Sequence, residues 1–362
     1  VLQTLYSMRP PDPQLTPDSW RAHWLERVEK CPMVLAEWMA HQHKDAYWRH
    51  GSVNEDYAQV ACPALVVCGW ADGYTEAAFR MAEKLNSASR VWIGPWAHTY
   101  PHLARPGPQG DFLKEALGWW DRWLKGRQNA IEDIPRVRLY LQDSAAPQSS
   151  YDHRPGHWLG FDRWPRDGVE MRQWAVSSGS LEPSSPIPFR PFAPVSLSSP
   201  LANAYHGPEW LPHGVGPELP PEQSIEDAGS LCFDSEVLSE PLLLCGAPDL
   251  SLRLRASSAG ALQVRLIDLR PDGSAARMTY TVLNLNHLSG LSEPATMPVN
   301  AWASVSLKMD SMAQVIPVGH RLRLAISTQA WPLIWPAARN MQIEVATESV
   351  HLHLPALNRP LE

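Results

Sequence analysis

The chain has 362 residues, of which 44% are hydrophobic and 19% are charged, a balance typical of globular proteins with room for two cored domains. Its formal net charge is -7, and its 31 Lys and Arg residues form no basic stripe, so no nucleic-acid partner is expected. No segment approaches the run of about 18 uncharged apolar residues that crosses a bilayer, and the N-terminus lacks a signal-peptide profile. We therefore expect no membrane partner.

The five cysteines favour a reducing environment. Their number is odd and they form no CxxC pair, which argues against both a disulfide framework and a thiolate zinc site. A cytoplasmic location is predicted.

The first 60 residues or so show short helical patterns interrupted by prolines. Trp20, Trp24 and Val28 recur at four-residue spacing, which predicts an amphipathic helix within a small helical segment. The chain begins at Val1 rather than Met. This start could reflect an artificial boundary, a processing site or the loss of an upstream region. Of these explanations we favour the loss of an upstream region.

Two strand–helix units are predicted between residues 61 and 126. The apolar runs at 64–68 and 90–93 are typical of buried parallel strands, and a helix is expected between them from Thr75 to Leu85. A second helix is predicted from Asp111 to a stop at Gly126. Its expected apolar stripe consists of Phe112, Ala116, Trp119, Trp120 and Trp123. Because two strands cannot form a stable open sheet, something else must complete it. If the sheet is incomplete, we expect residues 61–126 to show exposed apolar area, domain rearrangement or pairing with another chain.

From about residue 134 the apolar residues recur with period 2. This alternation is clear around Leu252, Leu324 and Leu352, and at least eight such segments predict an antiparallel sandwich of the jelly-roll type. Residues 183–221 hold 11 prolines and show no period, so a surface connection without strands is expected there.

Each predicted parallel strand is followed by one polar residue of a catalytic type. Asp72 follows the first strand and His98 the second, and the carboxyl ends of parallel strands meet at one edge of a sheet. An Asp that accepts from His Nδ1–H fixes the tautomer and leaves Nε2 to act as general base. The structural alternative is that Asp72 only caps a turn and His98 only packs against its neighbours.

Several motifs, in order along nearly the whole chain, resemble the cocaine esterase and X-Pro dipeptidyl-peptidase family of serine hydrolases. They are DAYW (45–48), GWADGY (69–74), GPWAHTYP (94–101), SEVLSEPLLLCGAPDLSLRL (235–254), LIDLRPDG (266–273) and GHRLRLAIS (319–327). The resemblance implies that Asp72 and His98 are triad members. It also implies an α/β-hydrolase remnant, consisting of a helical cap segment (1–60) and the C-terminal βα units of the core (61–130), followed by an all-β jelly-roll sandwich (134–362).

The nucleophile that the resemblance implies is absent from the sequence. In α/β hydrolases a Ser in a G-x-S-x-G elbow precedes the Asp and the His. Only Ser7, Ser19 and Ser52 precede Asp72, and none has the required glycines. We therefore expect the nucleophile and the oxyanion donors to lie in a missing upstream domain and this chain alone to be inactive.

The remaining candidate residues have structural alternatives. Trp38, Trp48 and Trp70 are candidates for a substrate pocket, although core packing is the alternative for each. His41, His43 and His50 lack a carboxylate at fixed spacing, so no metal site is predicted. Cys68 is interpreted as a small buried hydrophobe.

The leading hypothesis is that the chain is part of a serine acyl hydrolase that needs no cofactor and acts on a small ester, amide or peptide. Esterases, amino-acid ester hydrolases, acylases and dipeptidases all remain open, and a dipeptidase would need an acidic clamp, for which Glu37, Asp45 and Glu55 are the cap-region candidates. The alternatives are a non-catalytic jelly-roll module for binding or assembly and a metal-dependent hydrolase using the three cap histidines. Homo-oligomer formation is left open.

Overall fold

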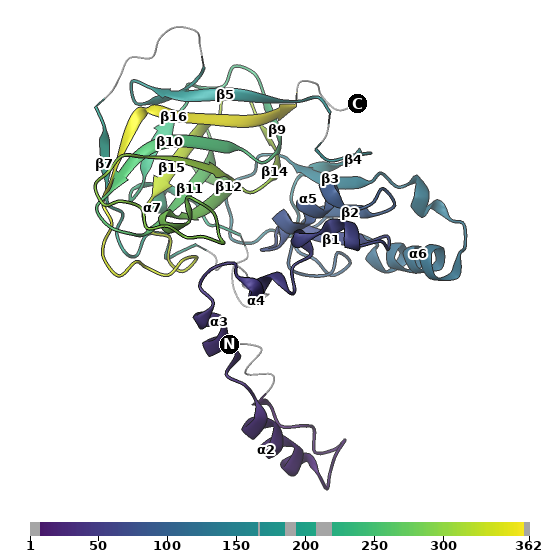
Figure 1. Cartoon of the computed structure of the whole chain (residues 1–362). Helices are drawn as coiled ribbons and strands as arrows, with labels where there is room; N and C mark the ends of the chain where they lie inside the picture. The colour runs from purple at the N-terminus through teal and green to yellow at the C-terminus, as the bar shows by residue number, and fades with distance from the viewer. Residues whose placement is uncertain (1–7, 166, 185–192, 208–218, 358–362) are drawn as a thin grey trace. The chain divides into compact units, whose positions relative to one another are not determined.

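The computed structural model describes residues 8–165, 167–184, 193–207 and 219–357 (Figure 1). The chain divides into two compact units. The first contains the residues up to Glu55 together with Ser289–Pro294, and the second contains Asp56–Leu288 and the residues from Ala295 onward. Among the described residues, no helix is long and apolar enough to cross a membrane.

The first unit is built from short helices. They are α2 (Trp20–Lys30), α3 (Val34–Ala40), α4 (Ala46–Arg49) and the 3-10 turn η1 (Val53–Glu55). The predicted helix through Trp20 and Trp24 is confirmed, because both residues lie in α2. Their rings stack with centroids 6.3 Å apart. No residue of these helices is buried.

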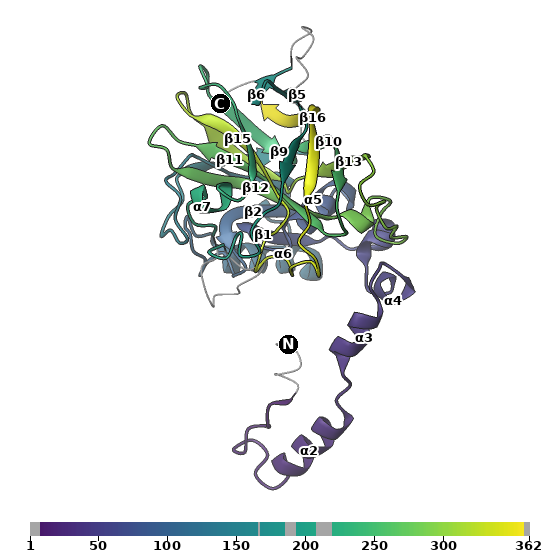
Figure 2. The same cartoon turned by 90° about the vertical axis from the view of Figure 1, so that its left-hand side faces the viewer.

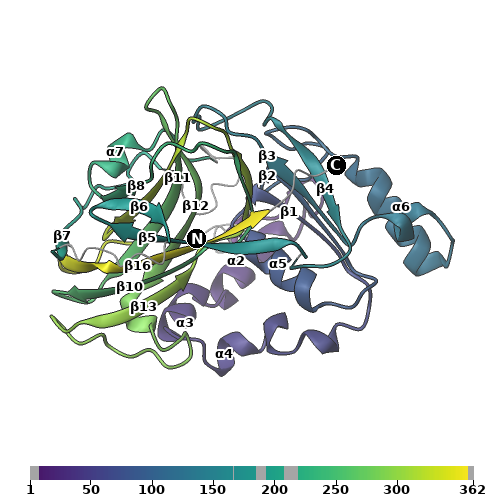
Figure 3. The same cartoon turned by 90° about the horizontal axis from the view of Figure 1, so that it is seen from above.

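The second unit begins with a three-stranded parallel arrangement. Its elements are η2 (Tyr57–Gln59), β1 (Leu65–Ala71), α5 (Thr75–Lys84), β2 (Arg90–Ala97), α6 (Phe112–Lys125), η3 (Ala130–Asp133) and β3 (Val137–Gln142). β1 pairs with β2 and β2 with β3, all in parallel, as expected for the two apolar runs. Val91 and Ile93 pack with α5, whereas Trp92 packs with Phe112 of α6, so the two helices cover opposite faces (Figure 3).

The β region adds the following elements. They are β4 (Gly156–Phe161), β5 (Val169–Ser177), β6 (Ser180–Pro183), β7 (Val195–Leu197), α7 (Ser224–Asp227), β8 (Leu231–Asp234), β9 (Leu242–Gly246), β10 (Asp249–Ala256), β11 (Ala261–Leu269), β12 (Ala275–Asn284), η4 (Leu285–His287), β13 (Ala303–Lys308), β14 (Met312–Ile316), β15 (Arg321–Ser327) and β16 (Ile343–Leu357).

These strands form two facing sheets. The smaller has the order β12-β11-β15-β8, and Figure 2 shows β11, β12 and β15 beside β9, β10 and β16 of the larger sheet. The predicted alternation is confirmed, because Leu252, Leu324 and Leu352 are buried between the sheets in one cluster. The sandwich therefore has its own apolar core.

The parallel strands are completed by the sandwich itself. The larger sheet has twelve strands, and its main path runs in the order β1-β2-β3-β14-β9-β16-β10-β13. The strands off this path are β4, β5, β6 and β7. β3 joins β14 in parallel through Gln142 and Gln314, so the sheet continues without a break past residue 134. β1 lies at the end of this order.

The expectation of no strand within 183–221 is wrong. β7 pairs antiparallel with β16, with Val195 opposite Val345 and Leu197 opposite Ile343. A three-residue strand paired on one side tolerates the neighbouring Pro194, because a proline beside an edge strand breaks no ladder hydrogen bond. The other parts of this stretch, 185–192 and 208–218, lie outside the described residues.

The predicted stripe of α6 is wrong at Trp120, whose side chain is 53% exposed, whereas Trp119 is buried. Leu113, Leu117 and Leu124 are exposed with it and form a second apolar stripe one residue further along the helix. Residues 61–126 therefore expose apolar area on α6, although β3 and β14 continue the parallel sheet.

Candidate active site

The site lies where the two neighbouring parallel strands β1 and β2 end. Their register runs from Leu65 opposite Arg90 to Ala71 opposite Ala97. Asp72 and His98 follow directly, and Nδ1 of His98 lies 2.8 Å from Oδ2 of Asp72. The structure therefore brings together the two residues that the sequence singles out.

Two glycines of the motifs allow the strands to approach closely here. A Cβ on Gly69 would lie 2.0 Å from the carbonyl oxygen of Trp96, and one on Gly94 would lie 2.3 Å from the Trp96 ring. Trp96 is 1% exposed and its Nε1 donates to the carbonyl of Pro108 at 2.8 Å. This packed indole supports the turn that carries His98.

The carboxylate of Asp72 is held from two sides. Oδ2 faces His98, and Oδ1 accepts a hydrogen bond from the backbone N–H of Tyr74 at 2.9 Å. The Asp72 side chain is 8% exposed and that of His98 is 37% exposed. A buried carboxylate that orients an accessible imidazole is the arrangement of a general base and its partner.

Two further His–Asp pairs occur among the described residues, and both differ from this one. His320 contacts Asp268 at 2.7 Å, but the side chains are only 9% and 1% exposed, and Asp268 also accepts from Ser144 Oγ. His41 contacts Asp45 across one turn of the first unit. The buried pair joins β11 to the turn before β15 and offers no accessible imidazole.

The three candidate tryptophans belong to different units. Trp38 and Trp48 are in the first unit, with ring centroids 6.2 Å apart, and Trp48 Nε1 donates to the carbonyl of His41. Trp70 is in the second unit, where its Nε1 donates to the carbonyl of Tyr140 and its ring stacks on Phe79. Only Trp70 shares a cavity with Asp72.

Several charged residues of the first unit pair with one another. His41 lies within ion-pair distance of Glu37 and Asp45, and the hydrogen bond that His41 donates to Asp45 raises the pKa of His41. Lys44 pairs with Glu55. Among the described residues, no group of three or more His, Cys, Asp or Glu side chains could hold a metal ion. His41, His43 and His50 therefore do not form such a group.

Cys68 is buried in β1, and burial raises the pKa of its thiol to about 12. A thiol with this pKa is protonated at neutral pH and is a poor nucleophile. This environment agrees with the interpretation of Cys68 as a packed hydrophobe.

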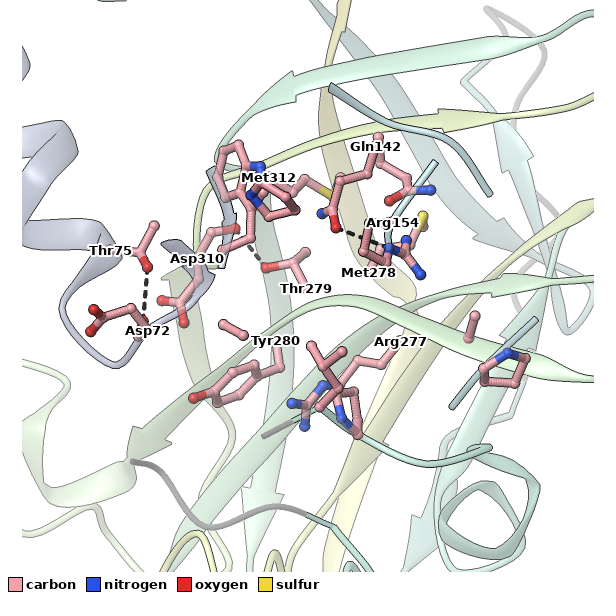
Figure 4. Close-up of a pocket in the computed structure, with 18 of the residues that line it drawn as sticks. Asp72, Thr75, Gln142, Arg154, Arg277, Met278, Thr279, Tyr280, Asp310 and Met312 are labelled. Atoms are coloured by element: carbon pink, nitrogen blue, oxygen red, sulfur yellow. Dashed lines mark hydrogen bonds between the residues drawn. The ribbon is translucent and has the colours of Figure 1, made fainter. Parts of the chain in front are cut away.

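A cavity of about 250 Å³ adjoins the turn that carries Asp72 (Figure 4). Arg277 and Tyr280 reach it from β12, and Asp310 from the turn before β14. The sequence predicts no role for these three residues. Arg277 and Tyr280 lie in a strand and Asp310 in a short turn without any recognisable motif, so only the packing of the sandwich against β1 reveals them.

Two families match consecutive parts of the chain. The X-Pro dipeptidyl-peptidase (S15 family) matches residues 1–100, and the X-Pro dipeptidyl-peptidase C-terminal non-catalytic domain matches residues 129–359. Asp72 and His98 lie in the first of these regions.

Individual relatives are similar over most of this chain. The cocaine esterase of Rhodococcus sp. (strain MB1 Bresler) is 25% identical over 91% of this chain and 59% of its own length. An aminopeptidase from a marine sediment Thaumarchaeota archaeon has a similar fold, with a TM-score of 0.70 and 17% identity over 92% of this chain and 62% of its own. A CocE/NonD family hydrolase from Staphylococcus aureus gives a TM-score of 0.67 and 13% identity over 92% and 61%.

The chain thus spans about three fifths of the length of these relatives. The non-catalytic domain family alone covers more than half of the chain, and the S15 family covers the segment before it. The chain belongs to the cocaine esterase and X-Pro dipeptidyl-peptidase family.

Proposed function

We propose that this chain is part of a serine acyl hydrolase that cleaves an ester or amide through an acyl-enzyme. The observation that carries the proposal is the contact between His98 and Asp72 at 2.8 Å, made from the ends of two parallel strands with the imidazole accessible. The membership of the chain in a hydrolase family and the position of both residues within the S15 match support it.

In this proposal the two side chains have distinct roles. Asp72 accepts from Nδ1–H of His98 and stabilises the imidazolium that forms during the reaction. Nε2 of His98 takes the proton of a serine hydroxyl as it attacks the acyl carbon and then gives that proton to the leaving group. Since the 362 residues contain no G-x-S-x-G elbow, the serine and the oxyanion donors come from outside them, and the chain alone is inactive.

The fold assignment belongs to the same proposal. Residues 1–60 would be a helical cap segment, residues 61–130 the last βα units of an α/β-hydrolase core, and residues 134–362 a jelly roll. The parallel pairing of β1 and β2, with helices on both faces, supports the middle assignment, and the two facing antiparallel sheets support the last. β3 is then shared, since it extends the parallel sheet.

The proposed substrate is a small ester, amide or peptide. Trp70 is the candidate contact nearest the pair, because it lines the cavity beside Asp72, and Trp38 and Trp48 are candidates from the cap segment. A cytoplasmic location is part of the proposal. It is supported by the five cysteines, which all lie in the described part of the chain and form no disulfide bond.

A second candidate function is a non-catalytic module for binding or assembly. It is favoured by the description of the family that matches residues 129–359 as a non-catalytic domain. Under this alternative the His98–Asp72 contact would have no chemical consequence.

Labelling by a fluorophosphonate probe separates the two. We would compare the 362-residue chain with a protein extended upstream, each as wild type, as His98→Ala and as His157→Ala, a control on an exposed position of β4. Labelling of the extended wild type and of H157A, with loss in H98A, is expected. If no folded form is labelled, the hydrolase proposal is wrong and the module is favoured.

A further inference from the structure

The cavity beside Asp72 has walls of different chemistry. One wall is the turn after β1, with Asp72, and another is β12, with Arg277 and Tyr280 (Figure 4). Glu76, from the first turn of α5, also lines the cavity. The apolar side chains of Met278, Met312 and Leu333 also line it. The cavity is therefore large enough for a small molecule and offers it both charged and apolar contacts.

The two arginines of this cavity differ in how their donors are used. Arg154 donates to Oε1 of Gln142 at 3.2 Å and to the carbonyl of Asp143 at 3.3 Å. Among the described residues, the side chain of Arg277 makes no hydrogen bond and no ion pair, and its guanidinium lies over the ring of Tyr280, 4.5 Å from the centroid. Arg277 therefore presents donors that the surrounding protein does not satisfy.

The side chain of Arg277 is partly exposed and carries its charge without an ion pair among the described residues. Burial lowers the pKa of its guanidinium, while the charges of Tyr280 and Glu226 raise that pKa and that of Arg265 lowers it. Arg265 already binds Glu226 and Asp227, at 3.1 Å and 2.9 Å, so these carboxylates are engaged elsewhere. An anion that entered the cavity would find donors on Arg277 that no side chain occupies.

The carboxyl group of Asp310 also lines the cavity and acts on Arg277. Its pKa is raised to about 7, first by burial and then by the charge of Glu76, so near neutral pH much of it carries a proton. A protonated carboxyl donates a hydrogen bond instead of supplying a negative charge. Asp310 is thus suited to assist an anion at Arg277 rather than to replace it.

We propose that Arg277 binds the carboxylate of a small organic acid in this cavity, with the apolar body of the acid against Met278, Met312 and Leu333. A planar guanidinium matches a planar carboxylate through two parallel hydrogen bonds. The apolar lining favours an organic acid over inorganic phosphate. Binding requires no catalysis, so this proposal stands or falls separately from the hydrolase proposal.

Calorimetric titration of the 362-residue chain with benzoate, acetate and phosphate at constant ionic strength tests it. Benzoate is expected to bind one site and to bind more tightly than acetate or phosphate. Arg277→Gln should weaken benzoate binding about 10-fold or more, the range for a lost charged hydrogen bond. The matched control is Arg253→Gln, because Arg253 also stacks on an aromatic ring, that of Trp302, but lies outside the cavity.

Equal benzoate affinity in wild type and R277Q would overturn the proposal, as would phosphate binding as tight as that of benzoate or no binding at all. Crystals of the wild-type chain grown with 4-bromobenzoate provide a test that needs no variant. The anomalous bromine signal should lie in the cavity, with the carboxylate on Arg277. An empty cavity, or the acid bound away from Arg277, would contradict the assignment even if R277Q failed to fold.

Discussion

Ala71 and Ala97 are register partners at the ends of β1 and β2, and each is followed directly by a residue of the candidate site. The 2.8 Å contact between Asp72 and His98 therefore follows from strand pairing rather than from the conformation of a long loop. Because paired strands resist displacement, the carboxylate of Asp72 holds the imidazole of His98 in one fixed orientation.

The first prediction concerns Asp72. In a protein that includes the nucleophile, Asp72→Asn should lower kcat for ester hydrolysis about 10⁴-fold, because the amide no longer fixes the productive tautomer of His98. KM should change much less, since Asp72 acts through His98. Asp111→Asn is the control, because Asp111 precedes α6 without making a side-chain cap. A kcat for D72N within a few-fold of wild type would exclude the proposed role of Asp72.

The Asp72–His98 pair could be predicted from sequence because both residues follow short apolar runs, which are local signals. The cavity residues could not, since Arg277 and Asp310 come to the turn after β1 only through the packing of the two sheets. β7 was missed for a related reason: three residues beside Pro194 carry no recognisable period, and the pairing with β16 decides their conformation. Tertiary contacts settle such elements rather than propensity.

The second prediction concerns the close approach at Gly69. Gly69→Ala should lower the free energy of unfolding by roughly 1–3 kcal/mol, because the new Cβ would meet the backbone carbonyl of Trp96 and force the strands apart. Urea unfolding followed by tryptophan fluorescence measures this. Gly51→Ala is the control, since nothing lies within 4 Å of a Cβ there. Equal stability of G69A and G51A would show that the strand ends can separate without cost.

The third prediction concerns the pH dependence that Asp310 introduces. Its pKa is raised from 3.8 to about 7, so the folded state binds its proton more tightly than the unfolded state does. The resulting stabilisation is fully present below about pH 4 and is lost as the pH rises through 7, up to roughly 4 kcal/mol for a shift of this size. The charged groups that act on Asp310 are Glu76, Arg277 and Arg80.

Asp310→Asn should therefore remove this component. Measured by urea unfolding between pH 4 and 8, the wild type should lose stability relative to D310N as the pH rises. Asp272→Asn is the control, because hydrogen bonds from Ser274 lower the pKa of Asp272 and its contribution changes only below about pH 4. Parallel curves for wild type and D310N would show that Asp310 titrates normally.

The fourth prediction concerns the buried ion network of the sandwich. Arg265 is 0% exposed and lies 3.1 Å from Glu226 and 2.9 Å from Asp227, with further hydrogen bonds to Gln223 and Ser230. Arg265→Ala would leave the buried Glu226 without its arginine, although Asp227 would keep Arg323, which donates to it at 2.8 Å. The expected loss is about 3–5 kcal/mol of unfolding free energy, measured by urea denaturation.

An ion pair near the surface gives the matched comparison. Arg255 donates to both oxygens of Glu344, at 2.9 Å and 2.7 Å, but the two side chains remain 40% and 31% exposed. Arg255→Ala should therefore cost only about 0–1 kcal/mol, because water solvates the remaining carboxylate. The contrast depends on burial and not on the number of hydrogen bonds. Equal losses in R265A and R255A would mean that water reaches Glu226 and Asp227 once the arginine is removed.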